Sequence, residues 1–127
     1  MSSLEELEGD RWGDPPAGAG RLVAAAYALR RRPVGSLDPE DLRLLIGQDI
    51  GLPHLLPVAV GLLRADPLAE GDLYPGDLLS AVLTRNPAAW RAVPEAAREL
   101  RAVVTGLGGL PPGLRAEADA FLSRHTV

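Results

Sequence analysis

Apolar residues recur along this chain at helical spacing, in short segments that proline and glycine separate. Residues 54–65 are nearly all apolar, which is typical of a helix buried at the centre of a fold. Residues 21–31 predict another helix, whose core-facing positions are Leu22, Ala25, Ala26 and Leu29. No segment shows the alternation of a convincing strand. The pattern predicts an all-α fold, a compact single-domain bundle of about six or seven short helices.

Several helix starts carry their own local signals. Ser3 with Glu6 three residues later is a capping-box pattern. Asp38 precedes a proline and two acids, which is a strong N-terminal signal, and Asn86 precedes Pro87 in the same way. The helices expected besides residues 21–31 and 54–65 lie at residues 3–8, 38–49, 75–83, 87–105 with a break at Pro94, and 114–124.

A chain of 127 residues fits one domain, residues 1–127, with residues 1–20 as a partly ordered N-terminal arm. Trp12 is expected to attach this arm to the body. The run Arg30–Arg32 lies at the end of a predicted helix, where positive charge complements the helix dipole; this interpretation is preferred to a binding role. The chain has no cysteine, which excludes disulfides and thiolate metal sites.

The first residues are acidic and lack the basic start and apolar run of an ordinary secretory signal. No apolar run approaches the ~20 residues that span a bilayer. We therefore expect a cytoplasmic protein that makes no membrane contact and is monomeric in its free state.

Acidic residues concentrate in the middle of the chain. The formal net charge is −4, and residues 38–77 alone carry eight acids against Arg43 and Arg64, a net of −6. This balance argues against direct nucleic-acid binding, which depends on Lys and Arg neutralising phosphates. A concentrated negative segment can instead steer a positively charged partner. A solvated acidic face with helix caps is the alternative.

The segment Leu68–Leu79 combines acids and turn-forming residues without a single base. We expect it to bind a basic partner. The predicted partner-binding residues are Asp49, Glu70, Asp72, Tyr74 and Asp77, with Glu40 and Asp41 as secondary candidates. Turn and helix-start chemistry at Asp72 and Asp77, and a half-buried Tyr74 that closes the core, are the alternatives.

The residues needed for catalysis or for metal binding are not arranged to act together. His54 and His125 are far apart in sequence and have no ligand at metal-binding spacing. No serine lies in a nucleophile-elbow context, and the glycines at 106–109 follow a helix rather than a strand. We therefore predict no catalytic residues, no metal and no cofactor, and a protein that is not an enzyme.

Three consecutive blocks carry a family resemblance. They are Leu42–Leu52, Leu56–Val60 and Asp66–Leu79, preceded by Arg32-Pro33 and Leu37. Ile46-Gly47-Gln48 and Tyr74-Pro75-Gly76-Asp77 are the distinctive parts. Across roughly residues 30–83 the chain resembles the immunity proteins of bacterial contact-dependent growth inhibition (CDI) systems. In the place of Leu73, members of that family often carry a second aromatic residue.

The resemblance implies a small, mostly helical, cytoplasmic protein that binds and blocks the C-terminal toxin domain delivered by a neighbouring cell. Such toxins are often nucleases, including tRNA-cleaving RNases, so the expected partner is a cognate basic toxin domain, with an RNase as one candidate. The alternative from a different class is a non-catalytic helical adaptor or self-associating structural domain. A small enzyme would need a pocket with convergent polar groups, which the sequence does not indicate.

Overall fold

The computed structural model describes residues 2–124. Within that range the chain forms eight α-helices and one short 3-10 helix, η1, and its only strand-like pairings are two isolated bridges. The fold is therefore all-α, as predicted, with one or two more helices than expected. The elements are α1 (Leu4–Glu8), α2 (Arg21–Arg30), η1 (Val34–Ser36), α3 (Pro39–Gly47), α4 (Leu52–Ala65), α5 (Asp77–Leu83), α6 (Pro87–Arg91), α7 (Pro94–Thr105) and α8 (Pro112–Arg124).

The predicted helix caps form as the sequence indicates. The Ser3 hydroxyl accepts a hydrogen bond from the Glu6 amide at 3.3 Å, and the Glu6 carboxylate accepts one from the Ser3 amide at 3.0 Å. Asp38 and Asp41 form a second reciprocal pair at 2.9 and 3.1 Å. These bonds satisfy amides at the helix N-termini that have no partner inside the helix. Pro94 begins α7, which confirms the predicted break within residues 87–105.

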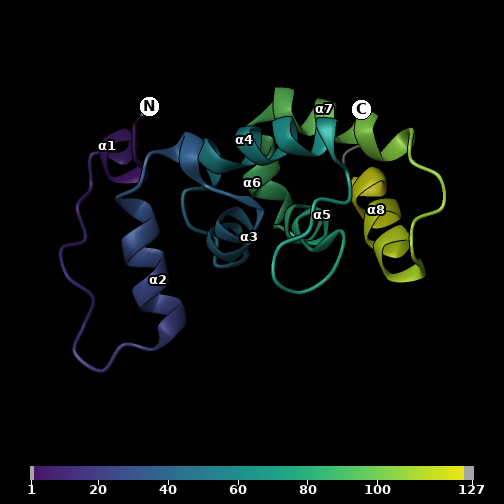
Figure 1. The fold of residues 1–127 in the computed structure, drawn as a ribbon. Helices are drawn as coiled ribbons and strands as arrows, with labels where there is room; N and C mark the ends of the chain where they lie inside the picture. The colour runs from purple at the N-terminus through teal and green to yellow at the C-terminus, as the bar shows by residue number, and fades with distance from the viewer. Residues whose placement is uncertain (1, 125–127) are drawn as a thin grey trace.

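The core is built around α4, which packs against α3, α5 and α7 (Figure 1). Its buried residues are Leu55, Leu56, Ala59, Val60 and Leu63. Buried apolar residues from all eight α-helices join the same cluster. Trp90 of α6 is fully buried; its indole N–H donates to the carbonyl of Val82 at 3.0 Å, and its ring meets Phe121 of α8 edge-on. The predicted central position of residues 54–65 is confirmed.

One predicted core position on α2 is wrong. Leu22 is 53% exposed and the adjacent Val23 is 41% exposed, whereas Ala26 and Leu29 are buried. Figure 1 shows the reason: the N-terminal end of α2 projects away from the other helices, so its first turn has no core to pack against. Helical periodicity marks the apolar positions of a helix but does not show how much of its length the core covers.

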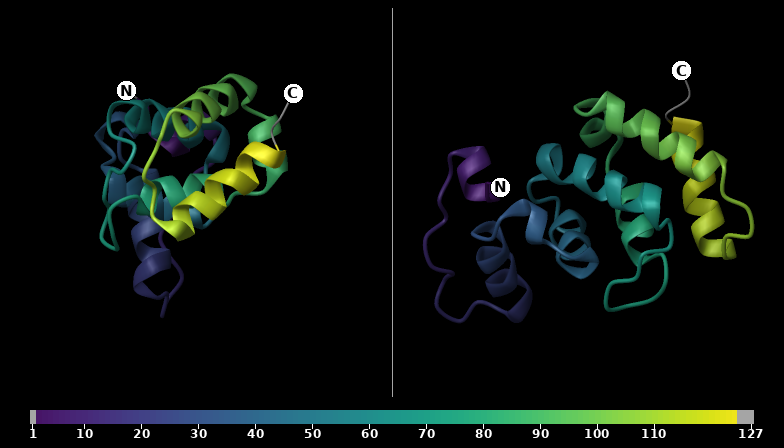
Figure 2. Two further views of the ribbon diagram at one scale, coloured as in Figure 1. Left: turned by 90° about the vertical axis from the view of Figure 1, so that its right-hand side faces the viewer. Right: turned by 45° about the horizontal axis from the view of Figure 1, so that its top comes forward.

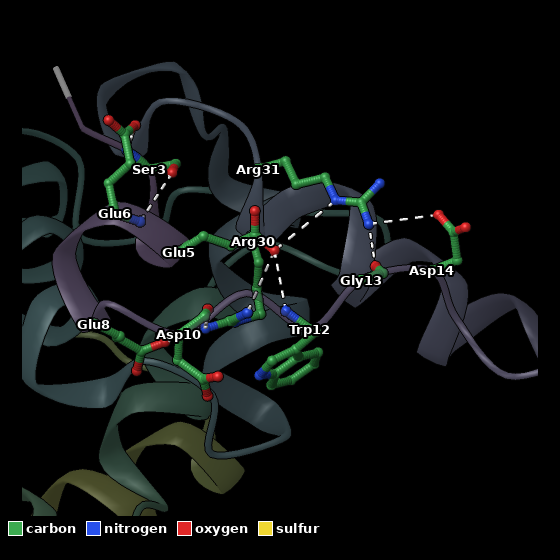
Figure 3. A network of polar contacts seen from close by, with 10 residues as sticks. All are labelled: Ser3, Glu5, Glu6, Glu8, Asp10, Trp12, Gly13, Asp14, Arg30 and Arg31. Carbon is green, nitrogen blue, oxygen red and sulfur yellow. Dashed lines mark hydrogen bonds and ion pairs between the residues drawn. The ribbon is translucent and has the colours of Figure 1, made fainter.

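The arginine at the end of α2 has a structural role that the sequence did not indicate. Arg30 is fully buried, and its guanidinium bonds the carboxylate of Glu8 at 2.5 Å and the carbonyl of Asp10 at 3.0 Å. Its guanidinium carbon lies 4.0 Å from the centre of the Trp12 ring, which also stacks edge-on against Tyr27. Figure 3 shows Arg30 with Glu8, Asp10 and Trp12, the contacts through which α2 holds the N-terminal arm. Trp12 thus attaches the arm together with the contacts that Arg30 makes to Glu8 and Asp10.

Arg31 contributes at the surface of the same region. Its guanidinium donates to the carbonyl of Gly13 and lies 3.8 Å from the carboxylate of Asp14 and 3.9 Å from that of Glu5 (Figure 3). Because the Arg31 side chain is 45% exposed and those distances are long, solvent weakens its ion pairs relative to the buried Arg30 contacts.

Candidate interaction surface

The acidic loop, defined here as residues 66–76, joins α4 to α5 and projects at the edge of the molecule in every view (Figures 1 and 2). Glu70 and Asp72 are exposed, and among residues 2–124 neither forms an ion pair. Two large side chains stand beside them, with Leu73 62% and Tyr74 44% exposed. The loop therefore presents two exposed carboxylates outside ion-pair distance next to apolar surface, and Arg43 lies near enough for the charge of Asp72 to help raise the pKa of that arginine.

Asp77, the first residue of α5, does not belong to the exposed part of this surface. It is only 2% exposed, and one carboxylate oxygen accepts a hydrogen bond from the Gly71 amide at 2.7 Å. The other oxygen accepts from the Leu73 amide at 3.0 Å. A buried carboxylate needs such donors, since burial without them is costly. The expectation that Asp77 contacts a partner is therefore corrected: its carboxylate faces the inside of the loop and fixes the loop backbone.

Glu40, at the start of α3, supports the same loop through a hydrogen bond to its backbone. Its carboxylate accepts a hydrogen bond from the Asp72 amide at 2.8 Å. Arg43 lies one turn further along α3, and its guanidinium donates two hydrogen bonds, of 2.6 and 2.5 Å, to that carboxylate. The same guanidinium lies 3.7 Å from the Asp77 carboxylate. The bonds from Arg43, together with that from the Asp72 amide, hold the pKa of Glu40 below its ordinary value. Glu40 is thus a support for the loop and not a free acid.

Two glycines allow this close packing. A Cβ atom at Gly71 would lie 2.6 Å from the Glu40 carboxylate and 3.0 Å from that of Asp77. Gly76 has a φ of +91°, and a Cβ there would lie 2.6 Å from the Leu114 side chain of α8. The loop is consequently pressed against α3 on one side and α8 on the other, and its backbone conformation is determined by both.

The other predicted contact residues lie elsewhere. Asp49 follows α3 with a φ of +59°, and its 65% exposed side chain pairs with Arg85 at 2.8 Å. Because Arg85 comes after α5 and the acidic loop comes before it, Asp49 and the loop lie at opposite ends of that helix. Asp41 bonds the Asp38 amide and pairs with Arg32 at 3.4 Å, so its carboxylate is already partnered.

The structure therefore brings together Glu70, Asp72 and Tyr74 and separates Asp49 from them. Arg43 is the residue that the sequence analysis missed at this site. The spacing of Glu40 and Arg43, three residues apart on a predicted helix, is a recognised pairing signal and could have identified it. The bond between Glu40 and the amide 32 positions later has no such local signal.

The described residues form neither a metal-binding cluster nor a membrane-spanning helix. Across residues 2–124, no three His, Asp or Glu side chains gather closely enough to hold a metal ion. His54 lies in the first turn of α4 and is partly buried, and His125 lies outside the described residues. None of the helices in the described range combines the length and apolar character needed to cross a membrane.

Comparison with known protein families supports the resemblance found from the sequence. Residues 6–100 match the model of a family described as CDI immunity proteins. The matched range contains all three blocks of the resemblance, the acidic loop, and both of the residues that support it, Glu40 and Asp77. A search of curated proteins gives no match.

Proposed function

Since the chain belongs to the CDI immunity proteins, we propose that it binds the toxin domain of a cognate CDI effector through the acidic loop and thereby neutralises it without catalysis. The family membership supports a toxin as the partner. The observation that carries the choice of surface is that Glu70 and Asp72 stand exposed and unpaired on a loop whose backbone is fixed by Asp77 and Glu40.

Rigidity matters for this function because a fixed loop loses little conformational entropy when it binds. Three backbone amides of the loop, those of Gly71, Asp72 and Leu73, are held by carboxylates from outside the loop tip. The exposed carboxylates are therefore presented in a set arrangement before a partner arrives. Complementary charge on a partner would raise the rate of association, and the half-exposed Tyr74 would supply buried area at the centre of the contact.

The chemistry of the loop favours a partner with a cationic surface. A toxin domain that cleaves RNA has such a surface, because it binds a phosphate backbone. We therefore propose a nuclease, with RNases as the leading class, and inhibition by a protein that covers the cationic substrate-binding surface. An interface of ordinary size would bury about 1,600 Å² in total. Asp49, at the other end of α5, would then lie near the rim of the contact.

The test is co-expression of this protein with the toxin domain encoded by the neighbouring gene. Growth should be restored by the intact protein, and the two proteins should co-purify. Continued killing in the presence of folded protein would reject the proposed function. Recovery of growth with a toxin domain that leaves cellular RNA and DNA intact would retain neutralisation and reject the nuclease assignment.

A further inference from the structure

A cleft of about 290 Å³ opens between the acidic loop and the start of α8. Two of its lining residues belong to the acidic loop, and the others belong to the C-terminal part of the chain. The lining residues are Tyr74, Pro75, Pro111, Gly113, Leu114 and Glu117. Residues 111–117 lie beyond residues 6–100, the range that the family model matches. This wall of the cleft is thus a feature of this chain outside the matched family region.

The cleft has a fixed shape because its two walls are joined. A Cβ atom at Gly76 would lie 2.6 Å from the Leu114 side chain, so the backbone of the loop and α8 are in close contact here. Below that contact, the Ser80 hydroxyl of α5 donates a hydrogen bond of 3.0 Å to the Glu117 carboxylate. Helices α5 and α8 pack against each other along this line. The position of Glu117 relative to the loop is therefore set by the fold.

The chemistry of the lining is asymmetric. Pro75, Pro111 and Leu114 provide apolar walls, and the half-exposed ring of Tyr74 stands at the loop side. Glu117 is partly buried, and among the described residues no cation pairs with its carboxylate. A partly buried carboxylate that lines the same cleft as an aromatic ring and apolar walls is suited to a cation on an apolar stem.

We propose that this cleft receives an arginine side chain of the bound toxin, an inference that rests on the proposed function. The methylene groups of the arginine would pack along the proline and leucine walls, and the guanidinium would lie between the Tyr74 ring and the Glu117 carboxylate. Arginine fits better than lysine because its planar, weakly hydrated guanidinium stacks on aromatic rings and pairs with carboxylates through two bonds. In this arrangement the charge of the acidic loop speeds association with the toxin, and the cleft adds specificity by binding one of its arginine side chains.

Glu117→Gln removes the charge of Glu117 with little change in the shape of the side chain. In Glu117→Gln the amide oxygen can still accept the hydrogen bond from Ser80. Glu95→Gln is the matched control, because Glu95 is an exposed acid on α7 that lines a different cleft, between α4 and α7. The binding of each variant to an inactivated form of the cognate toxin domain is measured by calorimetry, and thermal unfolding confirms that each variant is folded.

We expect Glu117→Gln to raise the Kd by about tenfold, the effect of losing one charge-assisted hydrogen bond, and Glu95→Gln to leave it unchanged. Equal Kd values for the two variants would overturn the inference and leave the proposed function intact. Absence of binding by the unaltered protein would overturn both.

A double-mutant cycle tests whether Tyr74 and Glu117 act on the same group. If one guanidinium contacts both, the effects of Tyr74→Leu and Glu117→Gln on binding free energy will not add, because either change releases that guanidinium from the cleft. Additive effects would show that the two residues contact separate parts of the toxin and would contradict a shared arginine.

Discussion

The carboxylate of Asp77 lies 2.7 Å from the backbone amide of Gly71, six residues earlier in the chain. This hydrogen bond fixes the backbone of the acidic loop. The second carboxylate oxygen of Asp77 accepts another hydrogen bond, from the Leu73 amide. An acid that resembled a binding residue in the sequence therefore acts as the internal support of the surface. Its neighbours in sequence, and not Asp77 itself, carry the exposed charge.

Asp77→Asn should lower the free energy of unfolding by about 2 kcal/mol, because the neutral side chain leaves one buried amide without its acceptor. Urea denaturation measures the difference. The control is Asp72→Asn, which alters an exposed side chain and should change stability by less than about 0.5 kcal/mol. If the two variants were equally stable, Asp77 would not be the support of the loop.

The stabilising contribution of Glu40 should depend on pH. Its pKa is lowered in the folded protein from an ordinary value of 4.5, chiefly by the Arg43 bonds and also by the Asp72 amide. A lowered folded-state pKa means that the stabilisation is complete above the unfolded-state pKa and is lost as the pH falls through the folded-state value. The stability difference between the intact protein and Glu40→Gln should thus be constant near neutrality and shrink below 4.5.

Urea denaturation of both proteins across the acidic range provides the measurement for Glu40. If the stability difference between the intact protein and Glu40→Gln grew on acidification, the pKa of Glu40 would not be lowered in the folded protein. Amide hydrogen exchange supplies an independent check, because protection of the Asp72 amide depends directly on the Glu40 carboxylate.

Arg30→Gln should destabilise the protein by about 1–3 kcal/mol and loosen the arm, because it removes the partner of the Glu8 carboxylate and the cation beneath Trp12. Quenching of tryptophan fluorescence by acrylamide should increase. Trp90 is fully buried, so added quenching in the folded state reports Trp12. Arg31→Gln is the matched control, and its more exposed side chain predicts a much smaller effect.

Reversal of charge at the loop tip should slow association with the toxin. Glu70→Arg combined with Asp72→Arg is expected to reduce the association rate constant by about tenfold at low salt, with a smaller reduction at high salt where charges are screened. Stopped-flow measurements give the rates. Glu95→Arg combined with Glu99→Arg makes the same change in net charge on α7. If this control slowed binding equally, net charge rather than the loop would govern association.

Much of the helical framework could be predicted because its signals are local. Ser3 with Glu6, and Asp38 with Asp41, lie three residues apart and form caps almost regardless of what surrounds them. Proline and glycine divide the helices in the same local way. The extent of burial is a tertiary property, and for that reason the helical spacing predicts a core position for Leu22 although the first turn of α2 projects beyond the core.

The candidate site could be predicted only in part. The sequence identified the loop, but it could not distinguish the exposed Asp72 from the buried Asp77, because the distinction depends on which amides lie nearby in space. Glu40 reaches the loop across 32 residues, and Arg30 meets Glu8 across 22. Contacts over such separations are set by helix packing, which no short motif encodes.

The loop is held in shape by backbone amides that bond to Asp77 and Glu40, and the exposed side chains at 70, 72, 73 and 74 take no part in those bonds. The side chains that we propose to face a partner and the carboxylates that hold the loop are therefore separate sets. Substitutions at the tip are expected to leave the scaffold intact. If the tip binds the toxin as proposed, the protein can therefore adapt to an altered toxin surface through changes at a few exposed residues.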